Sequence, residues 1–510
     1  MSKQEGFHDL PLSPPSGTKE LWRWLRDELR AAILNGRLKR GARMPSSRGL
    51  ADQYQCSRGT VVMAFEHLRA EGYIEGRKGT GTFVALALPD DSLPASRPAI
   101  RLNKQTSRAS ISRRGCIATE HVLTLPASRS IGKAFRSYEP AIDLFPVELW
   151  SRISGRVMRR APRSLYGQGD ARGYAPLRKA IAEYVGRTRG VRCEPDQVLV
   201  TAGTQQALDL IARLLLDPGD TVCMEDPGYP GAVYAFRAAG ARIMPIPVDA
   251  EGLRIDLARR QRRKGKLAYT TPANQFPLGI TMSLRRRLEL LNWAIAAGAW
   301  IVEDEYDAEY RYFGRPVPAL QSLDESGSVI YIGTFTKMLF NSLRLGFAVL
   351  PDRLVDAFAA ARSLSDRHPP TLEQAILAEF ILEGYFSHHV PRMRQVYAER
   401  ASILVEAAKR RLDGAIDVAP AASGMRTIGW IRSGEHDLDL AQRARSHGLE
   451  LAAVSQFALR HPAPAGLVLG FAGCAPAELR RGVDVLASIV ASNTPVHNAA
   501  TFRRASDSNN

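Results

Sequence analysis

The chain has 510 residues, of which 45% are hydrophobic, a composition typical of a globular protein with a large core. No stretch approaches the roughly 20 uninterrupted apolar residues of a membrane helix, and five scattered cysteines suit neither a disulfide framework nor a zinc site. The first residues lack the apolar core of a signal peptide, so we expect a cytoplasmic protein.

The net charge of +17 is concentrated in the first quarter of the chain. Residues 1–135 hold 22 Lys and Arg against 12 Asp and Glu, which gives them a net charge of +10. Such an excess favours a polyanion as the partner of this part of the protein, although a merely basic, soluble surface would give the same count.

Three helices and a hairpin are predicted at the start of the chain. An amphipathic helix is expected at 18–35, where apolar residues recur on one face. A short second helix follows it, and Ser57 caps a third. A glycine-rich turn then joins two strand-like runs between residues 73 and 84. This order of elements indicates a winged helix, an α+β fold, over residues 15–85.

Three blocks of this region, Met44–Ala51, Ser57–Val61 and Ala70–Ile74, resemble the GntR-type winged helix. The resemblance implies binding to a double-stranded DNA operator, with the N-terminal end of the recognition helix against base edges. The start of the preceding helix suits phosphate, and the basic wing tip suits phosphate or the minor groove. The DNA-binding residues that follow from the resemblance are Ser46, Ser47, Arg48, Ser57, Arg58, Gly59, Thr60, Arg77 and Lys78.

Residues 86–135 show no sustained periodicity and are rich in Ser, Pro and Arg. This composition predicts a flexible basic linker, with an ordered arm as the alternative. Residues 136–495 instead alternate short apolar strands with helices, which predicts an α/β domain with a mostly parallel sheet. A disordered tail is expected at 496–510. The strands of the α/β domain are expected at 198–200, 221–224, 267–269, 300–302 and 329–332, and two of its helices at 205–216 and 284–297.

The residues around Lys337 carry the most specific chemistry in the chain. Lys337 follows an apolar strand and the hydroxyl residues Thr334 and Thr336, and Arg344 comes seven residues later. Asp304 lies at the end of another apolar run. An amine that forms an imine, hydroxyls and a guanidinium for a phosphate, and an acid for a pyridinium nitrogen are what pyridoxal 5'-phosphate (PLP) requires.

The region from about 140 to 490 resembles fold-type I aminotransferases, and the whole chain resembles the MocR subfamily of GntR regulators. The resemblance implies that Lys337 carries the imine, that Asp304 pairs with the pyridine nitrogen, and that Tyr306 hydrogen-bonds the ring hydroxyl. Tyr229 would stack on the ring, and Tyr166 would reach the phosphate of a neighbouring subunit, so the site would need a homodimer. The other implied cofactor-binding residues are Asn274, beside the ring, and Gly203, Thr204 and Gln205, a second phosphate cradle at a helix N-terminus.

One departure from the aminotransferase pattern bears on catalysis. Aminotransferases hold the substrate α-carboxylate with an arginine in a strand near the C-terminus, and the matching position here is Val468. Because valine cannot pair with a carboxylate, we expect a PLP-dependent transcriptional regulator that senses its effector without turning it over. The effector would be the free aldehyde, as in PdxR-type members, or an amine lacking an α-carboxylate. Several alternatives stay open: Arg426 replaces the missing arginine, or the protein is a working aminotransferase with an attached DNA-binding module. The large domain could also serve only for dimerisation, and charge alone leaves open an association of the basic linker with membrane or RNA.

Overall fold

The computed structural model describes residues 20–77, 79–89, 111–119, 133–261, 264–314 and 317–492, so Lys78 and the predicted tail lie outside the described residues. The chain divides into two compact units, Met1–Ser110 and Ile111–Asn510, and each is described by itself. Within the described ranges, no helix is long and apolar enough to cross a membrane.

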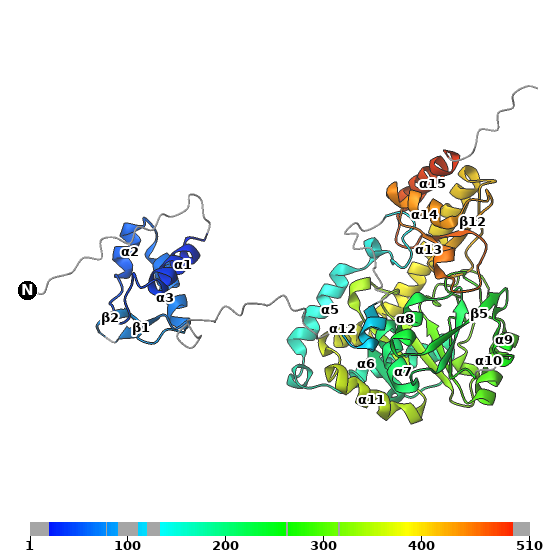
Figure 1. Ribbon diagram of the computed structural model, residues 1–510, viewed down its shortest axis with the longest axis horizontal. Coiled ribbons are helices and arrows are strands. Elements are labelled where there is room, and N and C mark those ends of the chain that lie inside the picture. Colours follow the sequence, from blue (N-terminus) through cyan, green and yellow to red (C-terminus); the bar gives the residue numbers. More distant parts are fainter. Residues whose placement is uncertain are drawn as a thin grey trace, which may run out of the picture. The chain divides into compact units, whose positions relative to one another are not determined.

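The N-terminal unit is a winged helix of three helices and a two-stranded hairpin (Figure 1). Helix α1 turns its apolar face toward the other two helices, as the periodicity at 18–35 predicts. Ser57 caps α3, because its side-chain oxygen accepts the amide of Thr60 at 3.1 Å. The elements are α1 (Leu21–Leu34), α2 (Ser47–Gln53), α3 (Arg58–Ala70), β1 (Ile74–Arg77) and β2 (Gly81–Val84).

The second unit is built on an eight-stranded sheet with the order β3-β10-β9-β8-β7-β4-β5-β6. The five strands from β9 to β5 are parallel, whereas β10 runs antiparallel to both of its neighbours and β6 returns from β5 as an edge strand. The prediction of a mostly parallel sheet is therefore confirmed. The strands are β3 (Val198–Thr201), β4 (Thr221–Asp226), β5 (Arg242–Asp249), β6 (Gly252–Leu253), β7 (Leu267–Thr270), β8 (Trp300–Glu305), β9 (Val329–Thr334) and β10 (Gly346–Val349).

Helices cover both faces of this sheet, which explains why its strands are apolar throughout. Val198 and Val200 of β3 pack into the cluster that contains α6, α12 and α13, whereas Leu199 between them packs into the cluster of α7, α8 and α11. The helices are α5 (Val147–Arg160), α6 (Ala175–Arg189), α7 (Thr204–Leu215), α8 (Pro230–Ala238), α9 (Ile255–Arg259), α10 (Leu284–Ala297), α11 (Asp352–Asp366) and α12 (Thr371–Leu382).

A smaller antiparallel sheet follows in the C-terminal part of this unit, coloured orange to red in Figure 1. Its strand order is β11-β12-β14-β13, and α13, α14 and α15 pack against it. The long helix α13 leads from the large sheet to the small one. The elements are α13 (Tyr385–Arg411), β11 (Ile416–Val418), β12 (Arg426–Ile431), α14 (Asp437–Ser446), β13 (Ala452–Ala453), β14 (Gly466–Gly470) and α15 (Pro476–Ala491).

Parts of the predicted linker at 86–135 are ordered. Residues Arg113–Thr119 form helix α4, and Arg114 donates from Nε to the carbonyl oxygen of Ala238 at 3.2 Å, at the end of α8. Phe135 forms a β-bridge with Gly470 of β14, so the last predicted linker residues belong to the small sheet. Composition favoured a flexible segment here because short stretches that pack against a distant element carry no periodic signal of their own.

Candidate functional site

Lys337 and Asp304 lie at the same edge of the large sheet. The strands β8 and β9 are parallel neighbours, with Asp304 opposite Ile332, and the chain reaches Lys337 just beyond the end of β9. The N-terminus of α7 opens at this edge too, since Gly346 at the start of β10 packs against Gly203. The fold therefore gathers the sequence-predicted amine, acid and phosphate cradle at one place, as expected for the carboxyl ends of parallel strands.

The side chain of Lys337 is hydrogen-bonded to the backbone of a distant segment. Its Nζ donates to the backbone oxygen of Tyr138 at 2.7 Å and lies 3.5 Å from Oδ1 of Asn341. Burial, reinforced by the nearby positive charge of Arg344, lowers the pKa of Lys337 to about 8. A lysine with such a pKa has an appreciable neutral fraction near pH 7 to 8, which is the form that attacks an aldehyde.

Asp304 offers one oxygen with no partner in the described structure. Its Oδ2 accepts the hydroxyl of Tyr269 at 2.7 Å, while Oδ1 is buried and unpaired. Burial raises the pKa of Asp304 to about 7. Glu303 and Glu305 point to the other face, where Glu305 pairs with Arg189 at 2.7 Å. The orphaned Oδ1 fits a cationic ring N–H, because such a donor would relieve the cost of an unsatisfied buried acceptor.

Donors for a phosphate converge beside these two residues. Gly203 precedes α7 with a φ of 100°, and the guanidinium of Arg344 lies so close that a side chain at Gly203 would come within 3.3 Å of it. Arg344 donates to the carbonyl of Ala202 at 2.9 Å. The buried hydroxyl of Thr336 finds no partner among the described residues, whereas that of Thr334 donates to Leu345 at 3.4 Å. A helix N-terminus, a guanidinium and a free hydroxyl fit an anion such as phosphate.

The other two residues of the predicted cradle have different surroundings. Thr204 is the first residue of α7. Gln205 donates from Nε2 to the carbonyl of Gly231 at 3.0 Å, and its Oε1 is buried without a described partner. The side chain of Gln205 therefore points toward α8 and Tyr229, whose ring lies over Gly231.

Phe276 lies at the centre of a group of aromatic rings that includes Tyr138, the ring next to Nζ of Lys337. The guanidinium of Arg426 covers one side of Phe276, 4.7 Å from the ring centre. Burial raises the pKa of Tyr229 to about 12, so that this phenol stays protonated. The rings around Phe276, with centroid distances, are Phe457 (4.9 Å), Tyr138 (5.7 Å), Tyr229 (5.7 Å) and Tyr306 (6.5 Å).

A polar network connects Asn274, Tyr306, Asp307 and Arg426. Asn274 donates from Nδ2 to both carboxylate oxygens of Asp307, at 2.8 and 3.0 Å, so its side chain is turned to that acid. Tyr306 donates to the backbone oxygen of Asn274 at 2.6 Å and accepts from Arg426 at 2.5 Å. Sequence reasoning missed Asp307, which directly follows Tyr306, because nothing local distinguishes a buried acid from an exposed one.

Two further predicted positions, Tyr166 and Val468, make no polar contact with Lys337 among the described residues. Tyr166 is 61% exposed, and its hydroxyl donates to the carbonyl of Met158 at 3.2 Å, so within its own chain it stays outside the site. Val468 of β14 is fully buried, opposite Ile428 of β12 and in the same apolar cluster as Val454. No charged group stands at position 468, and Arg426 on the neighbouring strand is engaged by Tyr306.

The segment 133–141 brings a strained residue to the site. Tyr138 has a φ of 78°, in the left-handed region, and the same segment holds Phe135 at 70°. A non-glycine residue in this region costs on the order of 1–3 kcal/mol and persists only where its surroundings hold it. The ring centre of Tyr138 is 5.3 Å from Nζ of Lys337. Sequence analysis did not identify Tyr138, because no local pattern announces a positive φ at a tyrosine.

The predicted DNA-binding residues lie together on the winged helix. Ser46 caps α2 as Ser57 caps α3. Arg58, at the start of α3, donates to the hydroxyl of Ser47 at 3.3 Å and so connects the two helix ends. The remaining described residues of this set are Arg48 and Gly59, both exposed, Thr60, partly exposed, and Arg77, which pairs with Glu75 and lies over the ring of Phe83.

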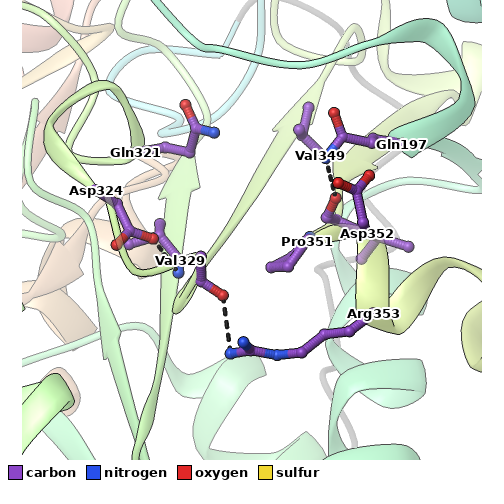
Figure 2. A pocket seen from close by; sticks show the side chains of 10 residues that line it. Gln197, Gln321, Asp324, Val329, Val349, Pro351, Asp352 and Arg353 are labelled. Carbon is purple, nitrogen blue, oxygen red and sulfur yellow. Dashed lines mark hydrogen bonds between the residues drawn. The ribbon is translucent and has the colours of Figure 1, made fainter.

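A cavity of about 300 Å³ opens at the opposite edge of the large sheet (Figure 2). It lies at the start of β9, beside Val329, whereas Lys337 follows the end of that strand. Two of its three charged residues are engaged: Asp324 accepts the amide of Val329 at 2.8 Å, and Arg353 donates to the carbonyl of Gly327 at 3.0 Å, while Asp352 is the first residue of α11. None of its lining residues has a buried side-chain polar atom without a partner, and it contains no lysine, cysteine or histidine.

Comparisons with known proteins match both units. The family of bacterial regulatory proteins, gntR family, matches residues 23–84, and aminotransferase class I and II matches residues 151–486. The chain is 41% identical to the probable rhizopine catabolism regulatory protein MocR of Rhizobium meliloti, over 91% of this chain and 93% of that protein.

A second transcriptional regulator and a solved aminotransferase structure are also similar to this chain. The HTH-type transcriptional regulator TauR of Rhodobacter capsulatus is 32% identical, over 85% of this chain and 89% of that one. Among solved structures, LysN of Thermus thermophilus, an α-aminoadipate aminotransferase complexed with N-(5'-phosphopyridoxyl)-L-leucine, is 30% identical with a TM-score of 0.65, over 71% of this chain and 92% of that one.

Proposed function

Because the chain belongs to the MocR family of HTH-type transcriptional regulators, which join a GntR winged helix to an aminotransferase-like domain, we propose that it binds PLP at Lys337 and senses PLP itself or an amine that reacts with it. The aminotransferase class I and II fold is that of PLP-dependent proteins. The winged helix would carry the response to a DNA operator.

One observation supports the cofactor most directly: the orphaned groups around Lys337 match the two ends of PLP. When bound, PLP supplies an aldehyde that bonds to an amine nitrogen and a ring that withdraws electrons. Oδ1 of Asp304 would accept a hydrogen bond from the ring nitrogen, and Thr336, Arg344 and the N-terminus of α7 would hold the phosphate. Nζ of Lys337, with its lowered pKa, would be the amine.

The other predicted residues would shape the two sides of the ring. Tyr229 would cover one face, and Tyr306 would donate to the ring hydroxyl after giving up its bond to the carbonyl of Asn274. Tyr166, exposed in its own chain, would reach the phosphate in the other subunit of a homodimer. Its position outside its own site, at the end of an exposed 3-10 turn, supports that arrangement.

Sensing without turnover is supported by the apolar surroundings of Val468. A substrate α-carboxylate would meet Ile428 and Val454 there, and desolvating it without a partner would cost several kcal/mol. The effector would therefore be PLP or an amine without an α-carboxylate. The relative from Rhizobium meliloti is named for rhizopine catabolism, and this name supports a small-molecule effector of catabolic genes.

The test is the visible spectrum of the purified chain after addition of PLP, followed by borohydride reduction and peptide mapping. We expect a covalent adduct on Lys337, its absence in Lys337→Ala, and its retention in Lys179→Ala, which removes an exposed lysine of α6. DNA affinity without PLP should be the same in all three proteins. An adduct elsewhere, or none, would refute the proposal. Steady release of a keto product from an amino donor would instead establish the working aminotransferase.

A further inference from the structure

We propose that Tyr138 is a positioning residue for Lys337, and that the segment 133–141 shifts when Nζ of Lys337 becomes covalently bonded. This inference rests on the proposed function. Tyr138 has a φ of 78°, in the left-handed region that is unfavourable for a tyrosine. Its backbone carbonyl accepts a hydrogen bond from Nζ of Lys337 at 2.7 Å. A backbone outlier at a reactive group is held there by its surroundings.

The surroundings of Tyr138 are anchored on both sides. Before it, the carbonyls of Ala134 and Phe135 accept the amides of Glu450 and Gly470, each at 3.0 Å. After it, the amide of Ala141 donates to the hydroxyl of Tyr397 at 3.0 Å. The start of the segment thus extends the small sheet. Between Phe135 and Ala141, the hydrogen bond from Lys337 to the carbonyl of Tyr138 connects the segment's backbone to the chain that follows β9.

The anchoring is tight enough to transmit a shift. Gly470 has no room for a side chain, since a Cβ there would come within 2.2 Å of the carbonyl oxygen of Arg136. Arg136 in turn pairs with Glu139 and Glu450. A movement of Tyr138 would therefore also shift the backbone segment that pairs with β14.

Covalent bonding at Nζ removes the donor that Tyr138 uses. An ammonium carries three hydrogens; when its nitrogen forms a double bond to an aldehyde carbon, two of them leave with the aldehyde oxygen as water, and the protonated product keeps one. With PLP bound, the ring hydroxyl would be a competing acceptor for that last N–H. The carbonyl of Tyr138 then has no partner, and its left-handed backbone is free to relax. An amine effector that displaces Lys337 from the aldehyde returns the hydrogens to Nζ and restores the contact.

Hydrogen exchange of the full chain with and without PLP tests this directly. In wild type, loading should speed exchange at the amides of Gly470 and Glu450 by roughly tenfold, which corresponds to an opening free energy lower by about 1.4 kcal/mol once the Lys337 contact is lost. Tyr138→Gly keeps the carbonyl and tolerates the positive φ. In Tyr138→Gly, the segment 133–141 should stay in place when PLP binds, so that exchange at Gly470 and Glu450 changes less than about twofold. Any effect of PLP on the affinity for random-sequence duplex DNA that is seen in wild type should be absent from this variant.

The two proposals fail separately. If borohydride traps no adduct on Lys337 of wild type, the proposed function fails. If the adduct forms but exchange at Gly470 and Glu450 does not change in wild type, or changes equally in Tyr138→Gly, the role of Tyr138 is refuted. Tyr138→Asn, which removes the ring but accepts the left-handed region, should behave like the glycine variant. Wild-type behaviour of the asparagine variant would also overturn the inference.

A separate observation on the winged helix supports a second proposal: the exposed apolar side chains Val62 and Met63 contact thymine methyl groups. They are 38% and 44% exposed on α3, on the same face as Arg58, Gly59 and Glu66. Apolar side chains left exposed on a recognition helix have one apolar target in the major groove, the C5 methyl of thymine.

Selection of duplexes from a random library by the full chain tests this. We expect the selected sites to contain fixed thymines, and replacement of all thymine by uracil, which lacks the methyl, to weaken binding by roughly fourfold per contacted methyl. Val62→Ala and Met63→Ala should lose this discrimination, while Leu34→Ala, an exposed apolar residue of α1, should keep it. Equal binding of thymine and uracil sites by wild type would refute the proposal.

Discussion

Replacing Asp304 by asparagine should change how the stability of the cofactor-free protein depends on pH. In the unfolded chain this carboxyl ionises near pH 3.8, but burial keeps it protonated in the folded protein until its pKa of about 7. Between these values the folded state binds more protons than the unfolded state. The free energy of unfolding therefore falls as pH rises from about 4 to 7, and the loss is complete above pH 7.

The size of this effect follows from the two pKa values. A difference of about 3 corresponds to roughly 4 kcal/mol at 1.36 kcal/mol for each pKa unit. Burial also raises the pKa values of Glu303 and Asp307, which adds losses of the same sign. Asp307 also raises the pKa of Asp304 through its charge, so the difference between the two proteins measures Asp304 together with its coupling to that neighbour. Asp304→Asn should gain stability over wild type by about 4 kcal/mol between pH 4 and pH 8.

Urea unfolding of cofactor-free wild type and Asp304→Asn at several pH values measures this difference. Asp209→Asn is the matched control, because its side chain is 58% exposed on α7 and pairs with Arg213 at the surface. The control should follow the wild-type pH dependence. Parallel curves for wild type and Asp304→Asn would refute the reasoning, because Asp304 would then be ionised in the folded protein and already satisfied by a partner.

Three further changes have defined outcomes. Arg189→Leu leaves Glu305 buried without its partner and should destabilise the second unit by about 3–5 kcal/mol in calorimetry, most of which Arg189→Leu with Glu305→Leu should restore. Ser57→Ala removes the cap of α3 and should lower the stability of the winged helix by about 1 kcal/mol, measured by hydrogen exchange. Arg48→Ala should weaken binding to all DNA sequences alike and reduce the slope of log affinity against log salt by about 1.

The fold was largely predictable because its signals are local. Each expected strand of the large sheet corresponds to an observed one, since a strand buried on both faces is an unbroken apolar run bounded by turns. The antiparallel entry of β10 between β3 and β9 could not be read this way, because pairing order is set by long-range contacts. Helix α4 was not predicted for the same reason: the helix is stabilised by packing against α8, and its composition alone does not indicate a helix.

In the site, too, features encoded locally in the sequence were predictable, whereas long-range contacts were not. Lys337, Thr336 and Arg344 are close in sequence, and Asp304 ends a recognisable strand, so their chemistry could be predicted. The contact between Lys337 and Tyr138 spans 199 residues and depends on a positive φ that no pattern encodes. The sequence pattern therefore predicts the reactive amine but not Tyr138, the residue whose backbone carbonyl accepts a hydrogen bond from it.

Arg426 shows why one charged residue near a site does not settle its specificity. Its guanidinium donates to Tyr306, lies 3.8 Å from a carboxylate oxygen of Asp307, and rests on the ring of Phe276. An effector carboxylate would have to displace Tyr306 and leave Asp307 buried beside a competing anion, which offsets the gain from a new ion pair. Asn274 already occupies both oxygens of Asp307 and holds that acid in place. Together with valine at 468, these contacts support the proposal that the effector lacks an α-carboxylate.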